Sequence, residues 1–240
     1  MHSSHVVTAA LTMATDNIRA VGEMLRPADQ LQVPLYAHYP VLRSILEAAA
    51  LAKWLLVPED PTERISRALR TRYSDAMEDA ALKKEERALL AAIDNGPDAD
   101  AIAAGEERAE ARLARDVAKV RSIAASQGIP WTRIKPGRAP WIHIIRAVCT
   151  IDEAPGFVRV PGNYAAHLWK VMSGLSHPSL SRAANHSDMT PLPGSSPDGT
   201  FHAQLTPSFR WTSEAITLAW NTSNEVVQLL HHRQRLPLER

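Results

Sequence analysis

The sequence predicts an all-α fold: a helical bundle with a long antiparallel helix hairpin and a Pro-rich loop before the C-terminal helix. Apolar residues recur at helical spacing through most of the chain. Residues 61–127 are dominated by Ala, Leu, Glu, Arg and Lys, which are strong helix formers. Proline and glycine interrupt the pattern at intervals that separate helices. We expect a single helical domain over residues 1–240, with the hairpin at 61–127 and the loop at 188–208.

The first two helices are expected at residues 5–26 and 40–57. Pro27 ends the first of them, and Pro58 ends the second. Pro40 is tolerated in a first turn because its missing N–H has no intrahelical partner there. The chain between the two helices is therefore predicted to be a connector.

The helix predicted at 61–93 has the clearest start signal in the chain. Asp60 can cap it, Pro61 takes the first position, and Glu63 follows three residues after the cap. Asn-Gly-Pro at 95–97 breaks it, and a second helix at 98–127 ends at Gly128, where a left-handed residue is favoured. The short connection predicts an antiparallel pair. Residues 61–120 carry 11 basic and 13 acidic side chains, which predicts solvated helix faces.

The second half of the chain is more interrupted. Prolines and glycines divide residues 128–162, and one helix is predicted there at about 139–150. Further helices are expected at 163–176 and at about 208–232. The segment FHAQL at 201–205 alternates between apolar and polar residues, which indicates a short strand.

Composition excludes several classes of protein. The net charge is +1, so the chain lacks the overall basic excess common in nucleic-acid binders. Its one cysteine, Cys149, lies in the apolar run IIRAVCTI and is expected to be a small buried side chain. We find no glycine-rich phosphate loop and no histidine pair with metal spacing, and we expect neither metal nor cofactor. The N-terminus does not resemble a signal peptide, and the most apolar segment, 41–57, is too short and too charged to span a bilayer. We expect a cytoplasmic protein without membrane contact.

The helix at 40–57 combines burial with charge. Its flanking residues are apolar almost all round, yet it carries Arg43 and Glu47, which share a face with Trp54 two turns later. Buried charges need partners. The pair is therefore either a structural tie between helices or the rim of a pocket that holds a ligand, and the sequence leaves both interpretations open.

The helix at 163–176 carries a polar stripe. Its members recur at steps of three to four residues: His167, Lys170, Ser173, Gly174 and His177. His177 stands at the helix end, where an imidazole can satisfy end carbonyls. The alternative is a general acid or base, or a ligand-binding imidazole, with Ser173 or Lys170 nearby.

Arginines gather at the start of the helix that begins at Pro61. Arg64 and Arg67 share a face, Arg70 follows, and Glu63 can pair with Arg67. Arginine clusters bind phosphate well, although ordinary surface charge accounts for the same pattern. Arg182 and His186 form a similar pair four residues apart.

Two segments carry a family resemblance. The run YPVLRSILEAAALAKWLL, continued by PEDPTERISRALR, and the later LWKVMSGLSHPSL are similar to a group of uncharacterised bacterial all-helical proteins. That group shares an Arg-x3-Glu helix and an S-G-x-x-H motif, and it more distantly resembles HEPN-type domains of toxin–antitoxin and phage-defence systems. The resemblance covers about residues 38–75 and 163–186.

Many HEPN domains are metal-independent ribonucleases with an Arg-x4–6-His motif, and this resemblance implies where such a motif would lie. The segment with the right spacing runs from Arg138 to His143. Pro140 lies inside it, so it straddles a helix start, and Ala139 replaces the usual polar residue. These departures weaken the nuclease interpretation, and an HEPN-like domain without cleavage would keep a binding role.

The sequence therefore leaves three functions open. The first is a helical binding or interaction protein, phage- or defence-associated, whose pocket contains Arg43, Glu47, Arg64, Arg67, Ser173 and His177. Its partner would be a protein or an anionic ligand. The second is an HEPN-like ribonuclease acting on RNA through Arg138 and His143. The third is a structural oligomerising scaffold, for example a homodimer, which exposed apolar surface on the second or last helix would support.

Overall fold

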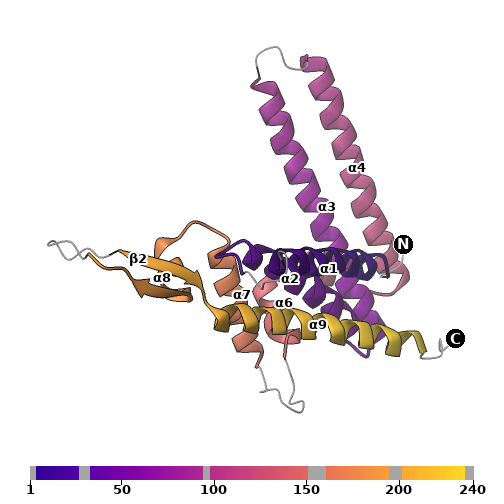
Figure 1. The fold of residues 1–240 in the computed structure, drawn as a ribbon. Helices are drawn as coiled ribbons and strands as arrows, with labels where there is room; N and C mark the ends of the chain where they lie inside the picture. Colours follow the sequence, from indigo (N-terminus) through magenta and orange to yellow (C-terminus); the bar gives the residue numbers. More distant parts are fainter. Residues whose placement is uncertain (1–3, 27–32, 94–97, 151–160, 195–201, 236–240) are drawn as a thin grey trace. The chain divides into compact units, whose positions relative to one another are not determined.

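The computed structural model describes residues 4–26, 33–93, 98–150, 161–194 and 202–235, and it confirms the all-α class (Figure 1). The chain divides into two compact units, which we describe separately. The hairpin unit comprises Pro58–Ala139, and the bundle unit comprises His2–Val57 with Pro140–Arg240. The expectation of a single domain stays a prediction. Among the described residues, no helix has both the length and the apolar character needed to cross a membrane.

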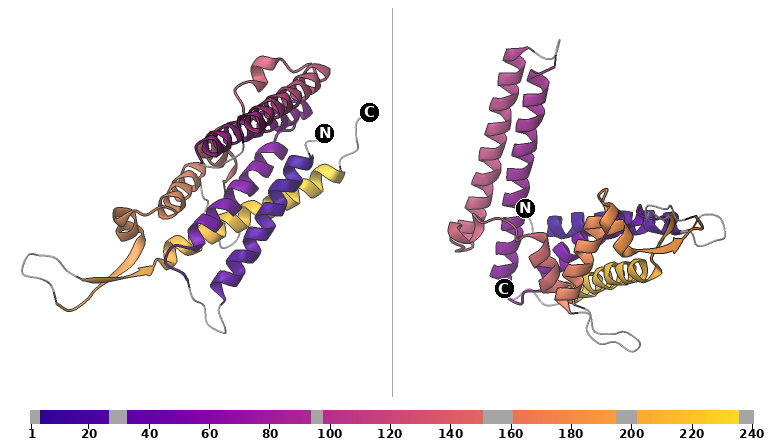
Figure 2. Two further views of the ribbon diagram at one scale, coloured as in Figure 1. Left: turned by 90° about the horizontal axis from the view of Figure 1, so that it is seen from above. Right: turned by 90° about the vertical axis from the view of Figure 1, so that its left-hand side faces the viewer.

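The hairpin unit contains α3 (Pro61–Ala91), α4 (Ala99–Ser126) and the short α5 (Trp131–Ile134), which the sequence pattern did not reveal. The first two run side by side as the predicted antiparallel pair (Figures 1 and 2). The Asp60 carboxylate accepts hydrogen bonds from the backbone N–H groups of Thr62 and Glu63, at 2.9 and 3.3 Å, which confirms the predicted cap. Gly128 has φ +65° and ends α4, also as predicted.

The hydrophobic core of the hairpin unit lies at one end of the helix pair. The buried residues there are Leu69, Val120, Ala124, Ile129 and Ile134, and Trp131 packs against them. The ring centroids of Tyr73 and Trp131 are 5.3 Å apart in an edge-on contact. The burial of α5 against this core explains why four residues without a helix signal of their own form a turn of helix.

The bundle unit is built around α2 (His38–Leu56). This helix packs against α1 (Ser4–Leu25), α6 (Trp141–Val148), α7 (Gly162–Leu175) and α9 (Phe209–Arg235). Figure 2 shows α1 and α9 running alongside it. Leu42, Leu46, Ala49 and Ala52 are each at most 2% exposed. The prediction that α2 is apolar nearly all round and therefore buried is confirmed.

The segment before α9 differs from the predicted loop. After the short α8 (Leu180–His186), strand β1 (Ser187–Pro191) pairs antiparallel with β2 (Ala203–Pro207). The strand expected at 201–205 thus lies two residues later, and residue 201 falls outside the described residues. β1 is mostly exposed. Because neither face of β1 is buried, no alternation of apolar and polar residues marks it in the sequence.

Candidate functional site

The predicted charge pair of α2 connects two helices of the bundle unit. Arg43 Nε donates a hydrogen bond to Glu47 Oε1 at 2.8 Å, and Trp169 Nε1 of α7 donates to the same oxygen at 2.8 Å. The guanidinium carbon of Arg43 lies 5.4 Å from the centroid of the Trp169 ring. The Arg43 and Glu47 side chains are 28% and 19% exposed. This geometry fits the structural interpretation, in which the pair ties α2 to α7.

The aromatic partner of this pair comes from another helix. Trp169 of α7, more than 120 residues later in the chain, makes the contact with Glu47. Trp54 itself is 6% exposed and belongs to the core. Helical spacing cannot reveal a partner on another helix, so sequence reasoning missed Trp169.

The S-G-x-x-H motif has a packing role that involves Arg182. A Cβ placed on Gly174 would lie 2.6 Å from both Cδ and Nη1 of Arg182, so a glycine leaves room for that side chain. Ser173 is half-buried, and His177 is exposed beyond the end of α7. The backbone N–H of His177 donates to the Gly174 carbonyl at 3.4 Å.

The arginines at the start of α3 bind groups of the hairpin unit itself. Arg64 Nη1 donates to the carbonyl oxygens of Pro58 and Glu59, at 2.8 and 2.7 Å. Arg67 Nε donates to Glu63 Oε1 at 2.8 Å, as predicted. Arg133 Nη2, which the sequence did not single out, donates to Glu63 Oε2 at 2.5 Å. Arg64 and Arg67 therefore belong to the hairpin unit, whereas Arg43, Glu47, Ser173 and His177 belong to the bundle unit.

The nuclease-like motif is divided between the units. Arg138 belongs to the hairpin unit, where its backbone N–H donates to Ser74 Oγ at 2.8 Å and its Nη2 to Glu78 Oε1 at 3.4 Å. His143 is exposed on α6 of the bundle unit. Helix α6 begins at Trp141, so the motif does straddle a helix start, as its proline predicts.

Two buried groups in the bundle unit have strongly shifted pKa values. Burial lowers the pKa of His38 to about 4, and the backbone of Pro34 offsets part of that shift. His38 Nε2 lies 3.1 Å from Thr212 Oγ1 of α9, so a neutral imidazole links α2 to α9. Burial raises the pKa of the Cys149 thiol to about 12, with Thr222 opposing the shift. Cys149 is fully buried, which confirms its expected packing role.

A cluster of aromatic, imidazole and guanidinium groups lies where α7, α8 and α9 meet. We call it the Trp211 cluster; its members are Tyr164, His167, Arg182, His186, Arg210, Trp211 and Glu214. The ring centroids of His167 and His186 lie 6.0 and 5.1 Å from that of Trp211. The Arg210 guanidinium carbon lies 5.2 Å from the same ring. The sequence indicated His167 and the Arg182–His186 pair separately but gave no sign that they meet around Trp211.

One carboxylate neutralises part of this cluster. The Tyr164 hydroxyl donates a short hydrogen bond to Glu214 Oε2, and Arg210 Nε donates to Glu214 Oε1 at 3.1 Å. Burial raises the pKa of Tyr164, and the hydrogen bond to Glu214 raises it further. Burial lowers the pKa of His186, and the nearby His167 and Arg182 add to that effect.

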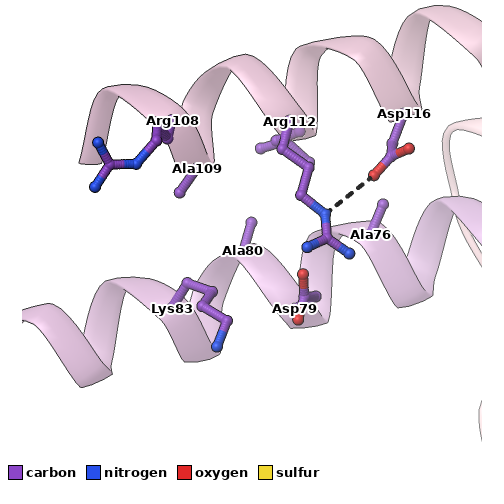
Figure 3. A pocket seen from close by; sticks show the side chains of 9 residues that line it. Ala76, Asp79, Ala80, Lys83, Arg108, Ala109, Arg112 and Asp116 are labelled. Atoms are coloured by element: carbon purple, nitrogen blue, oxygen red, sulfur yellow. Dashed lines mark ion pairs between the residues drawn. The ribbon is translucent and has the colours of Figure 1, made fainter. Parts of the chain in front are cut away.

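A recess lies along the seam between α3 and α4, within the hairpin unit (Figure 3). Its volume is about 180 Å³. Small or apolar side chains line it, namely Ala76, Ala80, Ala109 and Leu113, and charged ones surround them, namely Asp79, Lys83, Arg108, Arg112 and Asp116. Arg112 Nε is 3.9 Å from Asp116 Oδ2. The two helices therefore do not fill their own interface at this level.

Comparison with known proteins found no matching family model, no matching curated protein and no matching solved structure. Within the described part of the chain, no group of three His, Cys, Asp or Glu side chains is placed to hold a metal ion.

Proposed function

We propose that this protein is a helical interaction protein that assembles through the outer part of its hairpin, with a second copy of the chain as the partner. We call this outer part the arm; it comprises residues 72–93 and 98–119. One observation carries the proposal. No described residue of the arm is buried, while Leu82, Leu89 and Ile93 are 53%, 67% and 58% exposed.

Exposed apolar residues of this size gain free energy when a partner covers them, at roughly 25 cal/mol for each Å² removed from water. Leu82 and Leu89 are spaced at i and i+7, so they lie on one face of α3, and Ile93 lies two residues beyond the end of that helix. Glu86 falls within the same stripe, at a position where a polar residue fixes the register of a helix pair. A helix that is polar on its other sides and has no core of its own requires such a partner or many local ion pairs.

The charges of the arm favour a second copy as the partner. Residues 75–86 of α3 contain five carboxylates and two lysines, whereas residues 108–119 of α4 contain four cations and two carboxylates. A two-fold axis across the arm places α3 of one copy against α4 of the other, so opposite charges face each other on both sides. The two hairpins then form a four-helix arrangement.

The recess between α3 and α4 supports the same arrangement. Helices that associate insert side chains of one into holes between residues of the other. The recess is large enough for one aliphatic side chain, and the alanines that line it let a second helix approach. We expect Leu82 of one copy to occupy the recess of the other.

The last helix offers a competing apolar surface, as the scaffold interpretation requires. Phe209, Trp220 and Val227 of α9 are 72%, 59% and 45% exposed, and they lie on one face. This face lacks the charge pattern that favours self-association of the arm. We therefore assign the arm as the contact between copies and use α9 as the matched control.

The test is the mass of the protein in solution. We expect the wild-type chain to have twice the 26.4 kDa of one copy at tens of micromolar, and Leu82→Glu with Leu89→Glu to have the mass of one copy. Trp220→Glu should remain a dimer. If Trp220→Glu dissociates the dimer and the arm variant does not, the assignment to the arm is wrong. If the wild-type chain is monomeric, the scaffold function is wrong as well.

The ribonuclease interpretation is the weaker proposal, because the Arg138 backbone N–H donates to Ser74 and its side chain donates to Glu78, contacts that favour a structural role for Arg138 within the hairpin unit. Cleavage of RNA at pH 6 to 8 in the presence of a chelator would support the ribonuclease interpretation. The cytoplasmic location, the HEPN-like relationship and the association with phage defence stay predictions.

A further inference from the structure

We infer that the Trp211 cluster is a binding site for a phosphate monoester, with an affinity that increases as the pH falls. The inference is independent of the arm, because all members of the cluster lie in the bundle unit. The first support for this site is that side chains from three helices meet there. Residues from α7, α8 and α9, which are separated along the chain, place two imidazoles on the ring of Trp211.

The charge balance of the cluster favours an anion. Arg182 and Arg210 are cationic, and Glu214 is the carboxylate within the cluster. That carboxylate already accepts hydrogen bonds from Tyr164 and Arg210. Arg182, which extends over Gly174, therefore provides positive charge for a ligand, and the imidazole N–H groups can donate hydrogen bonds to it.

The two imidazoles are the reason why the proposed ligand is a dianion. His186 is partly buried, and the neighbouring His167 and Arg182 disfavour its protonation. An approaching anion reverses this balance, because it stabilises the protonated imidazole. A phosphate monoester carries close to two negative charges near neutral pH, so it compensates Arg182 and a protonated His186 together. A carboxylate carries one charge and compensates only one of them.

The accessible surface of the cluster is compatible with a small ligand. His167, Arg182 and Arg210 are exposed, while His186 and Trp211 are half-buried. Within the described part of the chain, two further titratable groups lie close to the cluster in sequence. Lys170 follows His167 by one turn on α7, and Asp188 on β1 follows His186 by two residues; both are exposed.

The experiment is a calorimetric titration of the full-length protein with inorganic phosphate at pH 6.0 and 7.5, with each dissociation constant expressed for the phosphate dianion, because the monoanion predominates at pH 6.0. We expect tighter binding at the lower pH. At pH 7.5 binding should be accompanied by proton uptake, seen as a difference in heat between two buffers of different ionisation enthalpy. Arg182→Gln should weaken binding about tenfold, in line with the loss of one charged hydrogen bond. His186→Gln should also abolish the proton uptake.

Two controls keep the test decisive. Lys170→Gln removes one cation from the same helix as His167, and it should change the affinity less than twofold. Arg182→Lys keeps the charge and should bind better than Arg182→Gln, which separates loss of a contact from loss of the fold. Absence of phosphate binding at pH 6.0 would overturn the inference. An equal effect of Lys170→Gln and Arg182→Gln, or binding of an RNA oligonucleotide without binding of phosphate, would overturn it too.

Discussion

Substituting Glu47 by alanine should destabilise the bundle unit by about 2–3 kcal/mol. The carboxylate accepts two hydrogen bonds at 2.8 Å, from Arg43 on its own helix and from Trp169 on α7. Hydrogen bonds to a charged group contribute about 1.5–3 kcal/mol each, and the partial exposure of this pair favours the low end. The change also leaves the indole N–H of Trp169 without its acceptor. For a unit of this size the expected decrease in melting temperature is roughly 5–10 °C.

The assay is urea unfolding followed by tryptophan fluorescence, with Glu47→Gln as the matched variant. Glutamine keeps a carbonyl oxygen for Trp169 and loses only the charge, so about half of the effect should remain. A double-mutant cycle with Arg43→Ala should give a coupling energy of about 1 kcal/mol. If Glu47→Ala changes the unfolding free energy by less than about 0.5 kcal/mol, as an ordinary surface change does, the pair does not tie α2 to α7.

Three further predictions follow from single buried or constrained groups. Burial lowers the pKa of His38 to about 4, so the unfolding free energy should be constant above the unfolded pKa near 6.5 and should decrease as the pH falls towards 4. This pH dependence should disappear in His38→Gln. If it persists in that variant, another group causes it. Burial raises the pKa of the Cys149 thiol to about 12, so this thiol should react with a disulfide reagent at pH 8 only after the protein unfolds. Labelling of the native protein at the rate of a small free thiol would contradict its burial. Gly137→Ala should destabilise the protein by about 1–2 kcal/mol, because φ at Gly137 is +75° and the new Cβ would lie 2.5 Å from Ser74 Oγ. Gly22→Ala in α1 should stabilise it by about 0.5–1 kcal/mol, because the new Cβ would have no atom within 4 Å. Equal effects of the two changes in thermal unfolding would refute the steric argument.

Features set by local physics could be predicted from the sequence. The Asp60 cap, the proline after it and the glycine after α4 each act within a few residues, and the structure confirms them. The same holds for burial of α2, because a helix that is apolar all round has no face for water. The pairing of Arg67 with Glu63 follows from helical spacing and is also observed.

Features that depend on contacts between distant segments could not be predicted. Trp169 joins the α2 pair, Arg133 joins Glu63, and β1 finds its partner only in the folded chain. The meeting of His167 and His186 at Trp211 belongs to the same class. Each of these side chains has an ordinary local setting, so no spacing rule marks it.

Sedimentation equilibrium of the wild-type chain against Leu82→Glu with Leu89→Glu tests the central proposal most directly. The proposal predicts a concentration-dependent approach to twice the 26.4 kDa of one chain for the wild type. It predicts the mass of one chain for the variant, with an unchanged helical signal in circular dichroism. A wild-type mass of one chain at every concentration, or a variant that still dimerises, would contradict self-association through the arm.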